Sequence, residues 1–84
     1  MKGNIIITGF QGFIGIYTTA KFINEGYVVY GVDKGSVDKN KFNLLEYLVH
    51  DKNKLHENLK TFFNFLEFFF VLVFSWKHLI FFIE

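Results

Sequence analysis

Three glycines near the N-terminus have the spacing of a loop that binds pyrophosphate. Gly9, Gly12 and Gly15 follow an apolar run at residues 5–7. Two phosphates are best held by backbone N–H groups at a helix N-terminus, because the helix dipole favours anions there. Glycines are needed because side chains would keep the phosphates away from the backbone. We expect Gly9 to allow the turn, Gly12 the approach of the phosphates, and Gly15 close packing of the helix on the strands.

An acidic residue further along has the position of a ribose ligand. Asp33 ends the next apolar run, residues 27–32. A carboxylate there can accept hydrogen bonds from the adenosine ribose hydroxyls and would repel a 2′-phosphate. The pattern therefore favours NAD over NADP, although Lys34 directly after it weakens that preference. Gly31, within the run, indicates a close approach of backbone near the adenine.

The elements that position these residues form a β-α-β unit. Residues 4–8 predict a buried parallel strand and residues 27–32 a second strand. Residues 13–25 predict a helix ending at Gly26, with one face formed by Phe13, Ile16, Ala20 and Ile23. The fold class is therefore α/β, a partial Rossmann fold that is half of a doubly wound parallel sheet of three to four strands. The alternative is a glycine-rich turn in a β-α-β fold that binds nothing.

The later part of the chain gives weaker patterns. We expect, in order, a polar loop over residues 33–41, a helical turn over 42–45, a third strand over 46–50, a helix over 55–66, and a fourth strand over 68–74. The helix rests on apolar residues at helical spacing, namely Leu55, Leu59, Phe62, Phe63 and Leu66. We therefore expect an NAD-binding half-domain at 1–75 and an unassigned hydrophobic tail at 76–84.

The glycine segment resembles a known family. Thr8-Gly9-x-x-Gly12-Phe13-Ile14-Gly15 is similar to the signature of extended short-chain dehydrogenases, the NAD-dependent epimerases and dehydratases, many of which act on nucleotide sugars. Residues 26–33 also resemble the family's second strand and its ribose-binding acid. The resemblance implies NAD as cofactor and a nucleotide sugar as substrate. The residues it assigns to the cofactor here are Gly9, Gly12, Phe13, Ile14, Gly15 and Asp33.

The resemblance weakens along the chain. Residues 47–51 look like the family's third strand and the acid after it, which implies that Asp51 contacts the adenine, with Lys52 in place of the usual apolar neighbour. Residues 55–66 resemble the helix that follows. Residues 71–74 stand where the family has small residues beside the cofactor, and Phe74 would crowd it.

No catalytic residue is assigned. The family's Ser/Thr, its Tyr-x-x-x-Lys pair and its substrate domain come after the point where this sequence stops. We therefore expect a truncated or frameshifted N-terminal fragment that is inactive. Tyr17 and Lys21 do have the Tyr-x-x-x-Lys spacing. However, their helix starts at the phosphate loop, whereas the family's pair stands on a later helix beside the nicotinamide, so we expect Tyr17 to pack and Lys21 to be solvated.

Composition excludes several other functions. The 84 residues allow one small domain, and the net charge of +1 gives no reason to expect a nucleic acid as partner. The absence of cysteine excludes disulfides and thiolate metal sites, and the three histidines share no metal-ligand spacing. We expect no metal and a cytoplasmic location.

The C-terminal third is unusually rich in phenylalanine. Nine of the 13 phenylalanines lie between Phe62 and Phe82. The longest uncharged run there, residues 68–76, is far shorter than the roughly 20 residues that span a bilayer, which argues against a membrane protein. Such an apolar segment promotes self-association instead. The alternative function is therefore a small interaction or membrane-associated protein that uses this tail.

Overall fold

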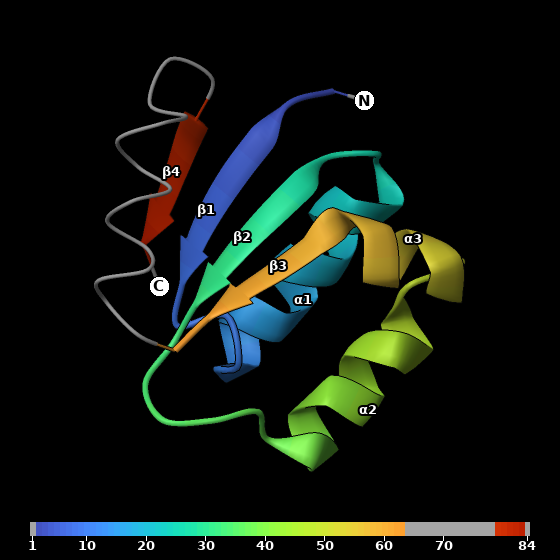
Figure 1. Cartoon of the computed structure of the whole chain (residues 1–84). Coiled ribbons are helices and arrows are strands. Elements are labelled where there is room, and N and C mark those ends of the chain that lie inside the picture. Colours follow the sequence, from blue (N-terminus) through green and yellow to red (C-terminus); the bar gives the residue numbers. More distant parts are fainter. Residues whose placement is uncertain (1, 64–78, 84) are drawn as a thin grey trace.

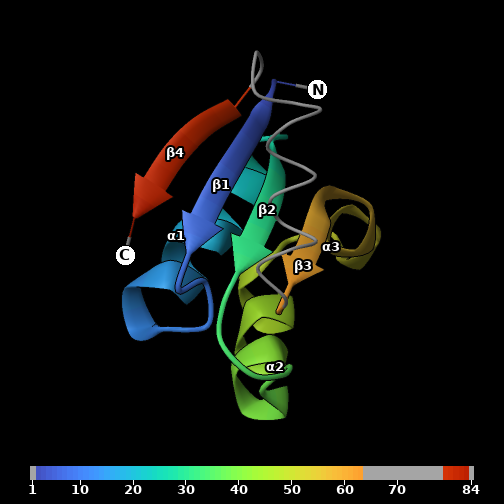
Figure 2. The ribbon, with the colours of Figure 1, turned by 60° about the vertical axis from the view of Figure 1, so that its left-hand side comes forward.

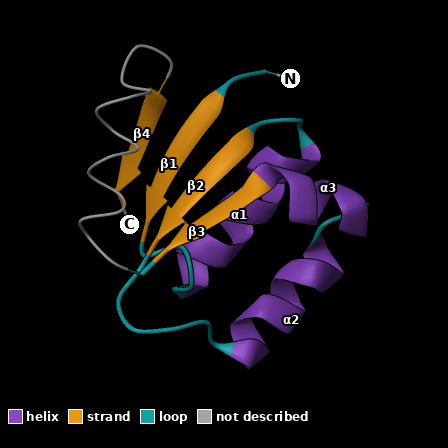
Figure 3. Cartoon of the chain, in the orientation of Figure 1, coloured by secondary structure: helices purple, strands orange, loops and turns teal. Residues whose placement is uncertain are grey.

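The computed structural model of the chain describes residues 2–63 and 79–83, which form a parallel sheet with helices on one of its faces (Figures 1 and 3). The elements, in order, are β1 (Asn4–Thr8), α1 (Phe13–Asn24), β2 (Val28–Val32), α2 (Lys39–Leu48), α3 (Lys52–Asn58), β3 (Leu59–Phe62) and β4 (Leu79–Ile83). When the molecule is turned by 60° about the vertical axis, the strands lie next to one another, with α1 behind β1 and β2 (Figure 2).

The sheet has four strands in the order β3-β2-β1-β4. Every pair is parallel, and β1 pairs with β2 on one side and with β4 on the other. All strands therefore end at the same edge of the sheet. The strand order reverses at β1, because β2 and β3 extend to one side of it and β4 to the other. This is the α/β, partial Rossmann arrangement that the sequence predicts.

The first β-α-β unit forms as expected. β1 has the predicted bounds, and α1 and β2 differ from theirs by one residue. Ile16, Ala20 and Ile23 bury one face of α1, and Gly26 adopts a φ of 96° after the helix. Phe13, which was expected on the buried face, is 74% exposed instead. It begins the helix at the open edge of the sheet, where no element covers it in the part of the chain that the structure describes.

The third strand predicted over residues 46–50 is wrong. Residues 46–48 form the last turn of α2, and residues 49–50 follow that helix. α2 has ten residues and takes the place of the end of the predicted loop and of the predicted single turn. Asp38 caps α2 by accepting hydrogen bonds from the N–H groups of Asn40 and Lys41. Leu45 is fully buried, so the helical spacing of the apolar side chains outweighs the strand preference of the segment.

The backbone after α2 is also held by a side chain rather than by a strand. The Asn24 amide donates to the Leu48 carbonyl oxygen at 3.1 Å and accepts from the His50 N–H at 2.9 Å. Asn24 ends α1, so these two bonds fix residues 48–50 beside the C-terminal end of that helix. They engage two backbone groups that a strand would need for pairing.

The helix predicted over residues 55–66 is correct only in its first turn. α3 ends at Asn58, and residues 59–62 form β3, which pairs with β2 from Val29↔Leu59 to Val32↔Phe62. Leu55 is buried in the core as expected. Hydrogen bonding to an existing strand favours the extended form, which local apolar spacing does not reveal.

A strand that the sequence left unassigned completes the sheet. β4 comes from the predicted tail and pairs with β1 from Asn4↔Leu79 to Thr8↔Ile83. The strand predicted over residues 68–74, and Phe74 with it, lie outside the described residues. Among the described residues, no helix is long and apolar enough to cross a bilayer.

The core lies between the sheet and the helices. It consists of Ile5, Ile7, Phe10, Ile16, Ala20, Ile23, Val29, Leu45, Val49 and Leu55. All three helices contribute to it, so burial of apolar surface fixes α1 against β1 and β2. The start of α1 is thereby held at the edge where the strands end.

Candidate functional site

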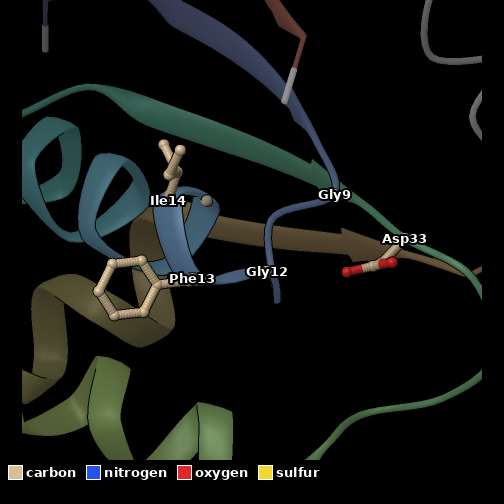
Figure 4. A pocket seen from close by; sticks show the side chains of 6 residues that line it. Gly9, Gly12, Phe13, Ile14 and Asp33 are labelled. Carbon is tan, nitrogen blue, oxygen red and sulfur yellow. The ribbon is translucent and has the colours of Figure 1, made fainter.

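A pocket of about 380 Å³ lies at the edge where the strands end (Figure 4). It is lined by Gly9, Gly12, Phe13, Ile14, Gly15 and Asp33. The first five come from the turn after β1 and the first turn of α1, and Asp33 directly follows β2. The structure thus brings together six of the seven residues that the sequence predicts for the cofactor.

The turn after β1 is closed by its own backbone. Gly9 has a φ of 70°, which lets the chain reverse, and its N–H donates to the Val32 carbonyl oxygen at 2.7 Å. The Gly12 N–H in turn donates to the Gly9 carbonyl oxygen at 2.9 Å. The turn is therefore tied to the end of β2, beside Asp33.

Gly15 allows α1 to start against this turn. A Cβ atom at Gly15 would collide with the Gly9 carbonyl oxygen and would lie 2.8 Å from the Phe10 Cα. Gly15 therefore lies close to the backbone of the turn. The sequence instead predicted close packing of the helix on the strands at this position. A side chain at this position would push the helix away from the turn.

Gly31 makes room for a side chain rather than for a ligand. A Cβ atom there would lie 2.7 Å from the Cγ of Phe10, whose ring is 1% exposed. Phe10 also contacts Phe63, with ring centroids 6.0 Å apart. The close approach that Gly31 indicates is therefore made by the Phe10 ring, which supports the floor of the turn.

The first turn of α1 presents backbone N–H groups that have no acceptor among the described residues. Gly12 is the N-cap, contributes no side-chain hydrogen bond, and no acidic residue follows in the first turn. Within residues 2–63 and 79–83, nothing accepts a hydrogen bond from the N–H groups of Phe13, Ile14 or Gly15. These donors and the positive end of the helix dipole make the position suited to an anion.

Asp33 points toward the turn (Figure 4), and backbone donors fix its carboxylate. Oδ2 accepts from the Gln11 N–H at 2.9 Å, and Oδ1 accepts from the Lys34 N–H at 2.8 Å. A carboxylate has about four acceptor positions, so each oxygen keeps capacity for another donor. The two hydroxyls of a ribose offer two such donors.

Asp51 does not join the pocket. It is exposed and is the N-cap of α3, where it accepts from the Asn53 N–H at 2.9 Å. It directly follows the segment that Asn24 holds beside the C-terminal end of α1, whereas the pocket lies at the N-terminal end. Its place differs from the prediction because residues 46–50 are not a strand of the sheet.

Neither Tyr-x-x-x-Lys spacing in the described part has the setting of a catalytic pair. Tyr17 and Lys21 are exposed on α1, with the Tyr17 ring 5.4 Å from that of Phe13. Tyr30 and Lys34 share the spacing, but the Tyr30 ring stacks on Phe62 at 6.0 Å and Lys34 lies on an exposed loop.

Sequence reasoning overlooked Gln11. Its side chain bonds the Ser36 carbonyl and the Asp38 N–H, and its own N–H bonds Asp33. The one sequence feature that could have indicated its role is that it is the single polar side chain in a turn made otherwise of glycine and phenylalanine. For metals, the described residues contain no group of three or more His, Asp or Glu side chains placed to hold an ion.

Comparison with known proteins identifies the family. The model of the NAD dependent epimerase/dehydratase family matches residues 5–68, which include all of β1 but its first residue and the whole of α1, β2, α2, α3 and β3. Searches of curated proteins and of solved structures give no significant match. The match covers most of the sequence and includes every residue that lines the pocket. The chain therefore belongs to the NAD-dependent epimerase/dehydratase family.

Proposed function

We propose that this chain binds NAD through the adenosine diphosphate half of the cofactor. The observation that carries the proposal is the meeting of the Asp33 carboxylate and the start of α1 in one pocket. The family's use of NAD supports it. Chain topology supports it too, because ligands of open α/β sheets bind beyond the carboxyl ends of the strands, where the strand order reverses.

The pyrophosphate would lie against the first turn of α1. The N–H groups of Phe13, Ile14 and Gly15 would donate to its oxygens, and Gly12 offers no side chain to keep them away. The side chains of Phe13 and Ile14, which are 74% and 64% exposed, leave the helix away from Asp33 in Figure 4. They would flank the phosphates without replacing their hydrogen bonds.

The adenosine ribose would lie at Asp33. Its two hydroxyls would donate to the acceptor positions that Gln11 and Lys34 leave unused on the carboxylate. Hydrogen bonds to a charged acceptor are stronger than neutral ones, so this contact contributes strongly to affinity. A 2′-phosphate at the same place would be repelled by the negative charge of Asp33.

The reaction we assign to the family fold is epimerisation or dehydration of a nucleotide sugar. When bound, NAD supplies an acceptor for a hydride from the sugar. The residues described here bind and orient the adenosine end of the cofactor. The sugar substrate and a cytoplasmic location remain predictions from the sequence.

We further infer that these 84 residues bind cofactor without turning over substrate. A general base must lie within hydrogen-bond reach of the proton it removes. Tyr17 stands on the exposed face of the helix that begins at the phosphates, and Tyr30 is stacked on Phe62. The alternative function, partner binding by the Phe-rich tail, rests on residues most of which lie outside the described part, and it stays a prediction.

Calorimetric titration with NAD tests the binding proposal. Wild-type chain should bind NAD, and Asp33→Asn should weaken binding about tenfold or more, because one charge-assisted acceptor is worth at least 1.4 kcal/mol. Asp51→Ala is the control, because it also removes one aspartate charge, at the N-cap of α3 outside the pocket. The NAD affinity of this variant should equal that of the wild type. Equal affinity of wild type and Asp33→Asn would overturn the ribose contact. A loss caused by Asp51→Ala would instead restore the adenine contact predicted from the sequence.

A further inference from the structure

Gln11 makes three hydrogen bonds that join the glycine turn to the loop after Asp33. Its N–H donates to Asp33 Oδ2 at 2.9 Å. Its side-chain Oε1 accepts from the Asp38 N–H at 2.7 Å, and its Nε2 donates to the Ser36 carbonyl oxygen at 3.2 Å. One residue of the turn thus bonds to three positions across the loop of residues 33–38.

These bonds hold a loop that, within the described residues, is exposed. Residues 34–38 are exposed, and Gly35 has a φ of 79°, so the loop depends on a flexible residue at its centre. The Gln11 side-chain amide bonds to the second half of the loop, at Ser36 and Asp38. Asp38 then caps α2, so the same bond also fixes the start of that helix relative to the turn.

The closed loop determines where Lys34 can go. Its N–H is bonded to Asp33 Oδ1, and its side chain is exposed. A 2′-phosphate on the ribose would need a cation to offset its repulsion by Asp33. Lys34 is the nearest cation in sequence, and the loop that carries it sets the position of its backbone, and so the distance its side chain must reach to such a phosphate.

We propose that Gln11 is a positioning residue that sets the preference for NAD over NADP by fixing the loop of residues 34–38 beside Asp33. This inference rests on the proposed NAD site and goes beyond it, because Gln11 itself does not line the pocket. Gln11 acts through two neighbours. It orients the Asp33 carboxylate through its N–H, and it holds the Lys34 loop closed through its side chain.

The test compares the ratio of the NADP and NAD dissociation constants in wild type, Gln11→Ala and Gln11→Met. Both variants lose the two side-chain hydrogen bonds, while Gln11→Met keeps the length of the side chain. Both should weaken NAD binding about three- to tenfold, as expected for one or two hydrogen bonds, and NADP binding less or not at all. The ratio should therefore fall in both. A wild-type ratio in Gln11→Met would show that the length of the side chain matters and would overturn the proposal.

Asn24→Ala provides the matched control. Asn24 is also a side-chain amide that bonds one backbone carbonyl and one backbone N–H, but at the opposite end of α1. Its loss should lower stability by a similar amount and leave the NADP to NAD ratio unchanged. If Asn24→Ala lowers the ratio as much as Gln11→Ala does, the effect is one of stability and the proposal fails.

Hydrogen exchange measured by NMR adds a readout without ligand. The Asp38 amide should exchange more slowly in the wild type than in Gln11→Met, because only the wild type has the Gln11 Oε1 acceptor. Equal exchange rates would overturn the proposal even if the variants bind poorly. Failure of the wild type to bind NAD overturns the proposed function and this inference with it, whereas NAD binding with unchanged ratios overturns this inference alone.

Discussion

At the scale of the residue, the pocket depends on glycines, because their lack of a side chain leaves room for close contacts. Gly15 lets the helix begin against the Gly9 carbonyl, and Gly31 leaves space for the Phe10 ring under the turn. Both contacts are made inside the protein rather than to a ligand. The spacing of glycines that indicates phosphate binding therefore also reflects the packing of the loop itself.

Gly15→Ala should destabilise the chain. The added Cβ would meet backbone atoms of Gly9 and Phe10, which cannot rotate away, and overpacking of this kind costs about 1–3 kcal/mol. Gly12→Ala is the matched control, because its Cβ would lie 3.2 Å from the same Gly9 oxygen and its φ of −71° suits alanine. Urea unfolding should show a clearly larger loss of free energy for Gly15→Ala. Equal losses of unfolding free energy in the two variants would show that the backbone of the turn shifts at little cost to accommodate the added Cβ.

At the scale of the element, polar side chains determine where the helices begin and end. Asp38 and Asp51 cap α2 and α3, and Asn24 fixes the segment between these helices beside the end of α1. Each of these side chains bonds at least one backbone group that a helix leaves unpaired at its end. The helical layer thus depends on local capping as well as on burial.

Asp38→Ala should cost about 0.5–2 kcal/mol of stability, because the N–H groups of Asn40 and Lys41 lose their acceptor. Asp38→Asn should cost much less, since asparagine is an equally good N-cap. Thermal unfolding followed by circular dichroism distinguishes the two variants. An equal loss in both would assign the effect to the charge of Asp38 instead of to its capping oxygen.

The sequence predicted the elements whose signals are local. The apolar run, the glycines and Asp33 specify β1, α1 and β2 and nearly all of the pocket. Residues 46–62 were predicted less well, because their apolar spacing is compatible with helix and strand alike. Pairing with β2 turns residues 59–62 into β3, and Asn24 holds residues 48–50, so both outcomes depend on partners distant in sequence.

The contacts of Gln11 were unpredictable for the same reason. Its partners Ser36 and Asp38 are 25 and 27 residues away, and no sequence pattern indicates that a turn residue will bond a loop so far along the chain. Asp51 caps α3 and does not line the pocket, because residues 46–50 do not form the strand from which its position was inferred.

At the scale of the whole molecule, the described residues form half of a doubly wound sheet, and the pocket at the carboxyl ends of its strands is the site that we propose for the phosphates and ribose of NAD. No turnover should occur when the chain is incubated with NAD and a panel of nucleotide sugars, because neither Tyr17 nor Tyr30 is placed as a base. NADH absorbance and chromatography of the sugars provide the measurement, with Gly12→Trp as a control whose pocket is blocked. Turnover above that control would show that the catalytic base lies elsewhere in the chain.

The pairing of β4 with β1 joins segments that are separated by nearly the whole sequence. Closing so long a loop is entropically costly before any contact forms, whereas β1, α1 and β2 are near one another along the chain. The first unit can therefore assemble while one side of β1 still has free N–H and C=O groups. An open strand edge of that kind recruits strands from other molecules. Pairing with residues 79–83 covers that edge of β1 and so protects the folded chain from aggregation with its own copies.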